Sequence, residues 1–331
     1  MENYLFGSAR VRVLENGLIG KEKLERLLAA PGVERCADLL AEFGVDVKRD
    51  EQSGAFLREE TLLGRLRAAY AEVGATSENA AFARLFRWQY DCNNIKAAIK
   101  CFKRGVDPDE MLFDFGNFDA KTVLSCVEKN DFEALGESFG SAAREATDTF
   151  AKTGNPQWVD LILDRACYAA MLCDARESGS DYVAELVQLK IDLTDLLTCV
   201  RLLRMKSGEA GKMMLRDALI DGGTLETAFF RKIYDEGEDA LWAALSYSEF
   251  AAFVKEAGGS EATLSAIERA ADNFWMTSVR RAKMIPYGIE PMVAYLAATE
   301  YEVRNLRIVL AGVEAGLSRK TIGERIRLSY V

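Results

Sequence analysis

Apolar residues recur every three or four positions along much of this 331-residue chain. One such stripe runs from Phe82 to Phe102, and a second segment, apolar around most of its circumference, runs from Val183 to Leu203. This spacing brings side chains onto one face of an α-helix, whereas a half-buried strand needs strict alternation of apolar and polar residues. Sustained β-branched runs are absent from the sequence and hairpin dipeptides are few. The sequence therefore predicts an all-α protein, in which neighbouring helices surround residues 183–203.

Three of the expected helices end in the same way. Each contains Asn or Asp followed by Ile or Leu, and a Gly follows 11, 13 or 11 residues later: Asn94 to Gly105, Asp195 to Gly208, and Asn305 to Gly316. Glycine readily takes the left-handed conformation that closes a helix, and basic residues in a last turn interact favourably with the helix dipole. We therefore expect each of these glycines to end its helix.

A second element recurs between these helix ends. A Gly precedes a Leu by 19, 19 and 18 residues in the pairs Gly20 and Leu39, Gly116 and Leu135, and Gly223 and Leu241. Copies about 100 residues apart are too long and too few for a short-repeat array. The order of the two elements predicts three related helical modules, at residues 1–105, 106–208 and 209–331.

The composition excludes several kinds of chemistry. The chain has no His, which is the commonest general base at neutral pH and the commonest metal ligand. Its seven Cys are odd in number and form no Cys-x-x-Cys motif, a pattern typical of reduced, mostly buried thiols in a cytosolic protein. The net charge of −10 argues against a nucleic-acid partner, which basic residues would have to bind. No apolar run approaches the ~20 residues that cross a membrane, and no signal peptide is evident.

Two features resemble catalytic motifs only superficially. The stretch 208–213 resembles a phosphate-binding loop but lacks its first Gly and its Ser or Thr, and we expect a helix-ending turn there. The acidic clusters at 107–110 and 235–239 lie in expected turns and helix starts, where carboxylates favour the helix dipole and water. We therefore predict no catalytic residue, no cofactor-binding residue, no cofactor and no metal site.

The charged residues leave two interpretations open. Arg201 and Arg204 near Asp192 and Asp195 form ion pairs on an exposed helix face, or they line a concave surface that a partner binds. The basic clusters, interleaved with apolar residues, are interpreted as solvated faces; they comprise Arg280, Arg281 and Lys283, and Arg319, Lys320, Arg325 and Arg327. The residues that contact partners are not assigned.

Three segments together resemble the C subunit of the V-type (A-type) ATPases, a family that includes the eukaryotic d subunit. They are Tyr4-Leu5-Phe6-Gly7-Ser8-Ala9-Arg10-Val11 near the start, Ile191-Asp192-Leu193-Thr194-Asp195-Leu196 in the middle, and Glu300-Tyr301-Glu302-Val303-Arg304-Asn305-Leu306-Arg307 near the end. The middle segment follows the family pattern I-D-x-x-N-[IL], except that Asp195 replaces the usual Asn. The resemblance covers essentially the whole chain, and its motifs are helix-packing patterns rather than catalytic signatures.

The resemblance implies an architecture and a role. Three helical modules would form a funnel with pseudo-threefold arrangement, the C-terminal helices closing the ring with the first module. The funnel would be a non-catalytic rotor subunit on the cytoplasmic face of the membrane. It would join the central shaft subunits (D and F type) to the membrane rotor ring, which carries protons or sodium ions during ATP-driven pumping or ATP synthesis. We also expect the helix ends at Gly105, Gly208 and Gly316 to gather at one rim.

Two other classes remain possible from the sequence. A cytosolic helical scaffold unrelated to ATPases would bind other proteins in solution. An all-α enzyme would contain a deep polar pocket with convergent carboxylates.

Overall fold

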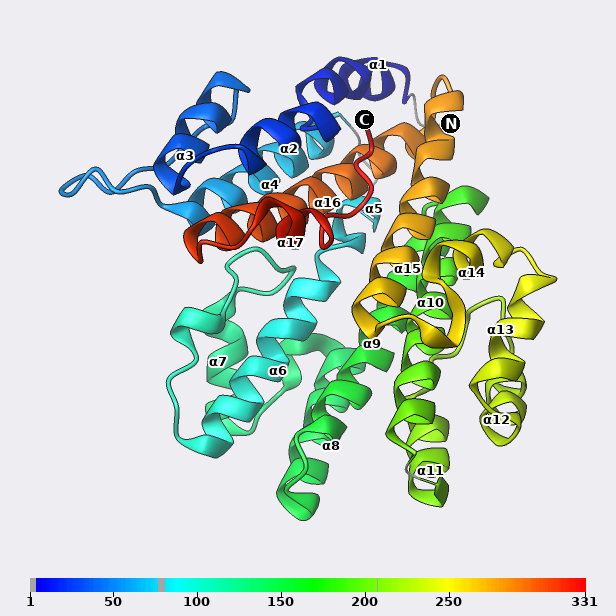
Figure 1. Cartoon of the computed structure of the whole chain (residues 1–331). Helices are drawn as coiled ribbons and strands as arrows, with labels where there is room; N and C mark the ends of the chain where they lie inside the picture. The colour runs from blue at the N-terminus through cyan, green and yellow to red at the C-terminus, as the bar shows by residue number, and fades with distance from the viewer. Residues whose placement is uncertain (1–3, 77–80, 207) are drawn as a thin grey trace. The chain divides into compact units, whose positions relative to one another are not determined.

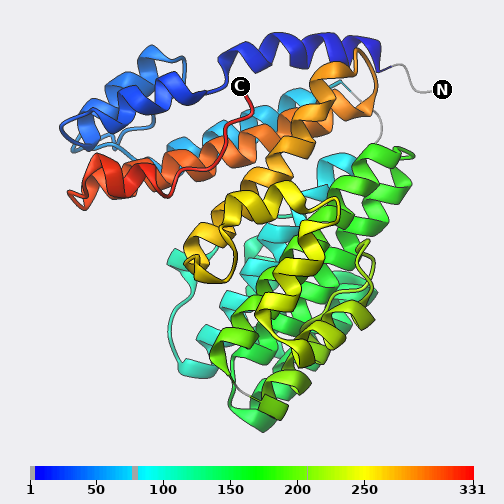
Figure 2. The ribbon, with the colours of Figure 1, turned by 45° about the vertical axis from the view of Figure 1, so that its right-hand side comes forward.

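The computed structural model describes residues 4–76, 81–206 and 208–331, and it is helical throughout, as Figures 1 and 2 show. Within these ranges the only extended pairing is an isolated bridge between Arg49 and Phe56, so the all-α prediction is confirmed. The α-helices are α1 (Leu5–Leu14), α2 (Lys21–Leu28), α3 (Val33–Glu42), α4 (Arg58–Gly74), α5 (Ala81–Leu85), α6 (Trp88–Arg104), α7 (Ala120–Lys129), α8 (Gly136–Thr153), α9 (Gln157–Glu177), α10 (Asp181–Met205), α11 (Gly208–Ala218), α12 (Thr227–Glu236), α13 (Glu238–Ser246), α14 (Ala251–Ala257), α15 (Leu264–Val279), α16 (Ile289–Glu314) and α17 (Arg319–Gly323).

Short 3₁₀ turns join several of these helices. They are η1 (Glu15–Gly17), η2 (Asp109–Met111), η3 (Glu133–Leu135), η4 (Gly259–Glu261) and η5 (Arg280–Met284). In the described part of the chain, no helix is both long enough and apolar enough to cross a bilayer.

The chain divides into two compact units. One contains residues 1–80 and 249–331, and the other contains residues 81–248. In the first unit α16 is the central helix, because it packs against α1, α2, α3, α4 and α15, and most of its residues are buried. In the second unit α9 and α10 occupy the centre, with α5, α6 and α8 packed against α9 and α11, α12 and α13 packed against α10. The division into modules 1–105, 106–208 and 209–331 stays a prediction.

The two predicted apolar segments have different outcomes. Residues 183–203 lie within α10, whose neighbours surround it as predicted. The stripe from Phe82 to Phe102 is not one continuous helix, because the chain breaks between α5 and α6 at residues 86–87. Its last member, Phe102, is 58% exposed, although Cys101 beside it in the final turn of α6 is buried. Periodicity therefore identifies the buried faces here but not the breaks between helices.

Two of the three predicted helix-ending glycines are confirmed. Gly105 (φ 66°) and Gly316 (φ 67°) follow α6 and α16 in the left-handed conformation. In each case the next residue donates its N–H to a carbonyl five positions back: Val106 to Cys101, and Leu317 to Gly312. This bond and the shorter one from the glycine itself close the helix.

The third predicted helix end is wrong in position. α10 ends at Met205, and Lys206 (φ 51°) takes the left-handed conformation, so Gly208 instead begins α11. The segment 208–213 accordingly lies at the start of a helix rather than in a helix-ending turn. A side chain with a Cβ carries a steric cost in this conformation, which glycine avoids.

Replacing Lys206 by Gly should therefore stabilise the protein by about 0.5–1 kcal/mol, because the exposed lysine has a strained backbone at the end of α10. The urea midpoint of unfolding measures this change. The matched control is Gly105→Ala, which should lower stability by a similar amount, since it adds a Cβ at a position with the same backbone conformation. A Lys206→Gly chain less stable than the parent would contradict this account.

Candidate functional site

Long helices in both units carry a buried acidic residue and, three positions later, a buried Asn or Asp. The pairs are Asp91 and Asn94 on α6, Asp192 and Asp195 on α10, and Glu302 and Asn305 on α16, and every member is at most 5% exposed. Burying a polar side chain is costly unless hydrogen bonds replace those of water. Each pair obtains most of its bonds from backbone groups of segments distant in sequence. We call these the first, second and third helix–loop contacts.

The first helix–loop contact holds the loop after η2. The two Asp91 carboxylate oxygens accept N–H bonds from Asn117 and Phe118, both at 2.9 Å. Asn94 makes a two-point contact with Phe113: its Oδ1 accepts from the Phe113 N–H at 2.8 Å and its Nδ2 donates to the Phe113 carbonyl at 2.8 Å. Burial raises the pKa of Asp91, and the two loop N–H groups partly oppose that rise. The loop is thus fixed to the first two turns of α6.

The second helix–loop contact repeats this plan between α10 and the loop before α12. Asp192 accepts the N–H of Thr224 at 3.1 Å and of Leu225 at 2.9 Å, and the Thr224 hydroxyl at 2.6 Å. Burial raises the pKa of Asp192, and these donors act in the opposite direction. Both Asp195 carboxylate oxygens lie 3.2 Å from the Ile220 nitrogen. Asp192 and Asp195 therefore neither lie on an exposed face nor line an open surface, so both sequence-based interpretations of these two residues are wrong.

The third helix–loop contact joins the two ends of the chain. Glu302 on α16 accepts the Ile19 N–H at 2.6 Å, and its other oxygen accepts from the Arg65 guanidinium at 2.8 Å. Asn305 repeats the two-point amide contact, accepting the Arg327 N–H at 2.8 Å and donating to the Arg327 carbonyl at 3.0 Å. Residues near both ends of the sequence are thus bonded to α16 in the first unit.

Glycines precede the donors of these bonds. Two residues before Phe118, Leu225 and Ile19 stand Gly116, Gly223 and Gly17, and a Cβ would meet the acid at the first two but nothing at Gly17. The pairing of Gly20 with Leu39 as a third copy of the repeat stays a prediction. The sequence signal that finds the acids is their position three residues before Asn94, Asp195 and Asn305.

The other charged residues singled out in the sequence have local partners. Arg204 donates from Nε and Nη2 to the Glu238 carboxylate, and Lys212 pairs with Asp235. Two of the four acids in the cluster at 235–239 thus have a basic partner in these pairs. The cluster at 107–110 includes Glu110, whose side chain lies outside the described part of the structure. Among the described residues, no group of His, Cys, Asp or Glu could hold a metal ion. All seven cysteines are thiols and six are buried.

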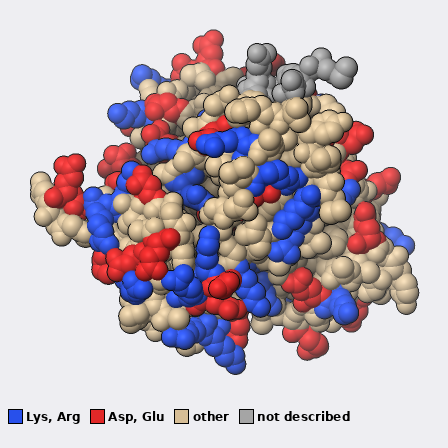
Figure 3. Space-filling model, turned by 90° about the horizontal axis from the view of Figure 1, so that it is seen from above, with Lys and Arg blue, Asp and Glu red and all other residues tan. Residues whose placement is uncertain are grey.

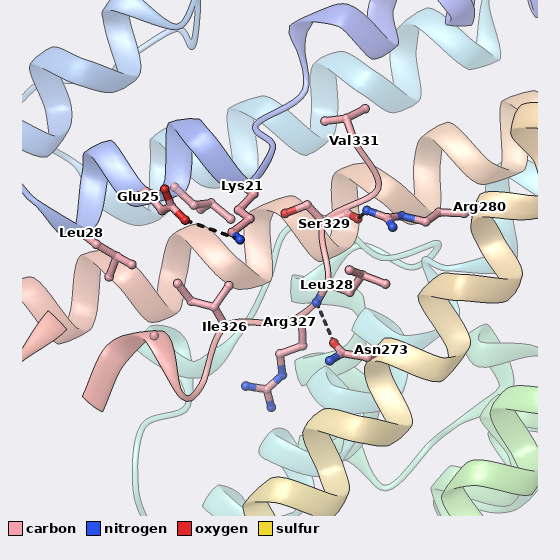
Figure 4. Close-up of a pocket in the computed structure, with 12 residues that line it drawn as sticks. Lys21, Glu25, Leu28, Asn273, Arg280, Ile326, Arg327, Leu328, Ser329 and Val331 are labelled. Atoms are coloured by element: carbon pink, nitrogen blue, oxygen red, sulfur yellow. Dashed lines mark hydrogen bonds and ion pairs between the residues drawn. The ribbon is translucent and has the colours of Figure 1, made fainter. Parts of the chain in front are cut away.

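A cavity of about 390 Å³ lies between α2, α15 and the C-terminal segment (Figure 4). Its charged lining residues already serve the fold. Arg280 donates to the backbone carbonyls of Ser329 and Tyr330, and Arg327 pairs with Asp272 at 3.1 Å. Asn273 accepts the N–H of Leu328 at 2.6 Å. These half-buried arginines are therefore not part of a solvated face. The cavity lies beside the C-terminal segment, and its lining lacks the convergent carboxylates of an enzyme site.

An exposed apolar surface lies where α1 meets the segment before α16. It consists of Leu5, Phe6, Val13, Met284 and Tyr287, which are 62–87% exposed. The Ser8 hydroxyl ties the two segments together, since its oxygen lies 3.0 Å from both the backbone nitrogen and the backbone oxygen of Gly288. The view of Figure 3 is toward the side of the first unit that carries α1, and it shows uncharged surface beside several Lys and Arg side chains.

A family model matches most of the chain. The model described as ATP synthase (C/AC39) subunit aligns with residues 8–325. This chain belongs to that family. The resemblance seen in the sequence is thereby confirmed, and the chain is identified as a C subunit of A-type or V-type ATP synthases.

Individual relatives match at full length. The A-type ATP synthase C subunit from Haloquadratum walsbyi is 26% identical over 336 residues, covering 94% of this chain and 94% of that protein. The protein of the same name from Methanosarcina mazei is 24% identical, covering 98% and 92%. That from Methanocaldococcus jannaschii is 21% identical, covering 93% and 82%.

The helix–loop contacts predict that Gly→Ala substitutions at three glycines have very different effects on stability. A Cβ added at Gly116 would lie 2.0 Å from Oδ1 of Asp91, and one at Gly223 would lie 2.2 Å from Oδ1 of Asp192. Gly116→Ala and Gly223→Ala should each destabilise the protein by about 2 kcal/mol or more, because the change displaces a buried carboxylate from its donors.

Gly17→Ala is the matched control and should be close to neutral, because a Cβ there meets nothing within 4 Å. The longer side chain of Glu302 is consistent with this extra space. Urea unfolding and limited proteolysis of the loops compare the three variants. Equal losses at all three glycines would show that the destabilisation does not come from a Cβ displacing the buried carboxylate.

Proposed function

We propose that this chain is a non-catalytic rotor subunit that couples the central shaft of the catalytic head to the ion-carrying ring in the membrane. The family match over residues 8–325 carries the proposal, because it spans both compact units and the buried acids Asp91, Asp192 and Glu302 of the three helix–loop contacts. The full-length relatives are named as subunits of A-type ATP synthases. In this role the chain lies at the cytoplasmic face of the membrane and binds the D-type and F-type shaft subunits and the ring.

The central helices suit a part that transmits torque. α10 has 25 residues and α16 has 26, and most of their side chains are packed against other helices. A loop is fixed near the middle of each by a buried carboxylate and its neighbour three residues on. Packed interiors of this kind have low compressibility, so they transmit strain instead of absorbing it. These features support a mechanical role.

The three helix–loop contacts support a pseudo-threefold, funnel-like arrangement. Each contact uses an acid and an Asn or Asp on one helix, and in each the acid binds the backbone two residues after a glycine. In the third contact the N-terminal residue Ile19 supplies the donor that a following loop supplies in the other two. In the proposed funnel, the C-terminal helices close the ring with the first module, and the ends of α6, α10 and α16 gather at one rim.

The buried carboxylates support a structural rather than a chemical role. Asp91 and Asp192 bind loop backbone N–H groups, and Glu302 binds one such group and Arg65. General acid–base catalysis instead needs a titratable group within reach of a substrate proton. ATP chemistry belongs to the catalytic head, and this chain passes on the rotation.

Deleting this subunit from the assembled ATPase should uncouple ATP hydrolysis in the catalytic head from ion transport by the membrane ring. In membrane vesicles, ATP hydrolysis should persist whereas ATP-driven ion uptake should fall to background, because the shaft no longer turns the ring. Adding back the purified protein is the control and should restore ion uptake. The proposal fails if the catalytic head needs this chain in order to hydrolyse ATP, or if uptake survives without it.

A further inference from the structure

The second helix–loop contact differs from the other two at one atom. Asn94 and Asn305 each bind a single loop residue at two points, with the amide oxygen accepting an N–H and the amide nitrogen donating to the carbonyl. Asp195 occupies the same position and accepts the Ile220 N–H, but an ionised carboxylate has no hydrogen to donate. A protonated carboxyl group has one donor and one acceptor, the same set as the amide.

The surroundings of Asp195 favour the neutral form. The side chain is 2% exposed, and the charges that act on it come from Asp192, one turn earlier on α10, and Asp221, in the loop that contains Ile220. Both are acidic, and like charges disfavour ionisation of a neighbouring carboxyl group. Burial, with these two groups, raises the pKa of Asp195 to about 8.

The titratable and charged groups on the helices packed against α10 do not offset the rise in the pKa of Asp195. Cys199 lies on the next turn of α10, and Tyr168 of α9 bonds to Thr194, the residue before Asp195. Tyr234 of α12 and Glu238 of α13 interact electrostatically with Cys199, and Glu238 is also paired with Arg204. The α11 cations Lys212 and Arg216 are paired with Asp235 and Asp217 at the surface.

We propose that Asp195 is a buried proton-binding site, protonated at neutral pH, at the position that Asn94 and Asn305 occupy in the other two helix–loop contacts. On the alkaline side the O–H bond breaks, the proton passes to water, and the carboxylate left behind faces two other carboxylates. The loop before α12 then loosens while the first and third helix–loop contacts, built with asparagine, stay closed. The proposal rests on the repeated geometry and does not depend on the proposed function.

The sign of the pH dependence follows from the raised pKa. The closed contact retains a proton that the open loop, with an ordinary Asp, releases at a much lower pH. Stability from this contact is therefore fully present below about pH 4 and is lost as the pH rises toward 8. Above about pH 8 the loss levels off, because both states are then ionised.

Hydrogen exchange at the Ile220 amide in the full chain tests this directly. Its protection factor should fall about tenfold per pH unit between about pH 4 and pH 8 in the parent, and it should be nearly constant with pH in Asp195→Asn. The reciprocal variant, Asn94→Asp, should transfer the same pH dependence to the Phe113 amide. The carboxyl carbon of ¹³C-labelled Asp195, assigned by its absence from Asp195→Asn, should titrate near pH 8.

Three results would overturn the proposal. Parallel pH profiles for the parent and Asp195→Asn would show that no proton is held at this site. A carboxyl resonance that titrates near pH 4 would show the same. An Asp195→Asn chain that does not fold would also contradict it, because asparagine supplies every contact that the protonated carboxyl group is proposed to make.

Discussion

The bond between a buried carboxylate and the backbone N–H groups of a distant loop is the interaction on which this fold depends. An acidic side chain inside a helical protein is costly unless donors surround it, so the loop must dock wherever the acid is buried. Asp91, Asp192 and Glu302 each impose this condition on a different helix. Apolar packing stabilises the units, whereas these acids specify which loop lies against which helix.

The third contact differs because it closes the first unit between residues 283 positions apart in the sequence. The first and second contacts join residues 19 to 33 positions apart, so each forms within one stretch of chain. Closing a long loop costs more conformational entropy, although the cost grows slowly with length. The pairing of Glu302 with Arg65 and the two-point amide of Asn305 strengthen this contact. The ends of the chain are thereby structural parts of one unit.

Periodicity and glycine placement were sufficient to predict the helical class, the enclosed helix α10 and the ends of α6 and α16. They failed at Gly208, because Lys206 adopts a backbone conformation that composition does not reveal. They also placed Asp192 and Asp195 at a charged surface, since a carboxylate near arginines in sequence usually has them as partners. Its true partners are backbone groups, which every loop carries and no residue type signals. Only the recurrence of an acid three residues before Asn94, Asp195 and Asn305 could have indicated the buried pairs.

The proposed coupling role requires three stiff helix–loop contacts around a single opening that receives the shaft. A cryo-electron microscopy map of the assembled ATPase with this protein in place measures this most directly. The account predicts that Asp91, Asp192 and Glu302 are related by one approximate threefold axis, that this axis passes through the shaft, and that the ends of α6, α10 and α16 lie on one rim. Three positions without a common axis, or a shaft that bypasses the opening, would contradict it.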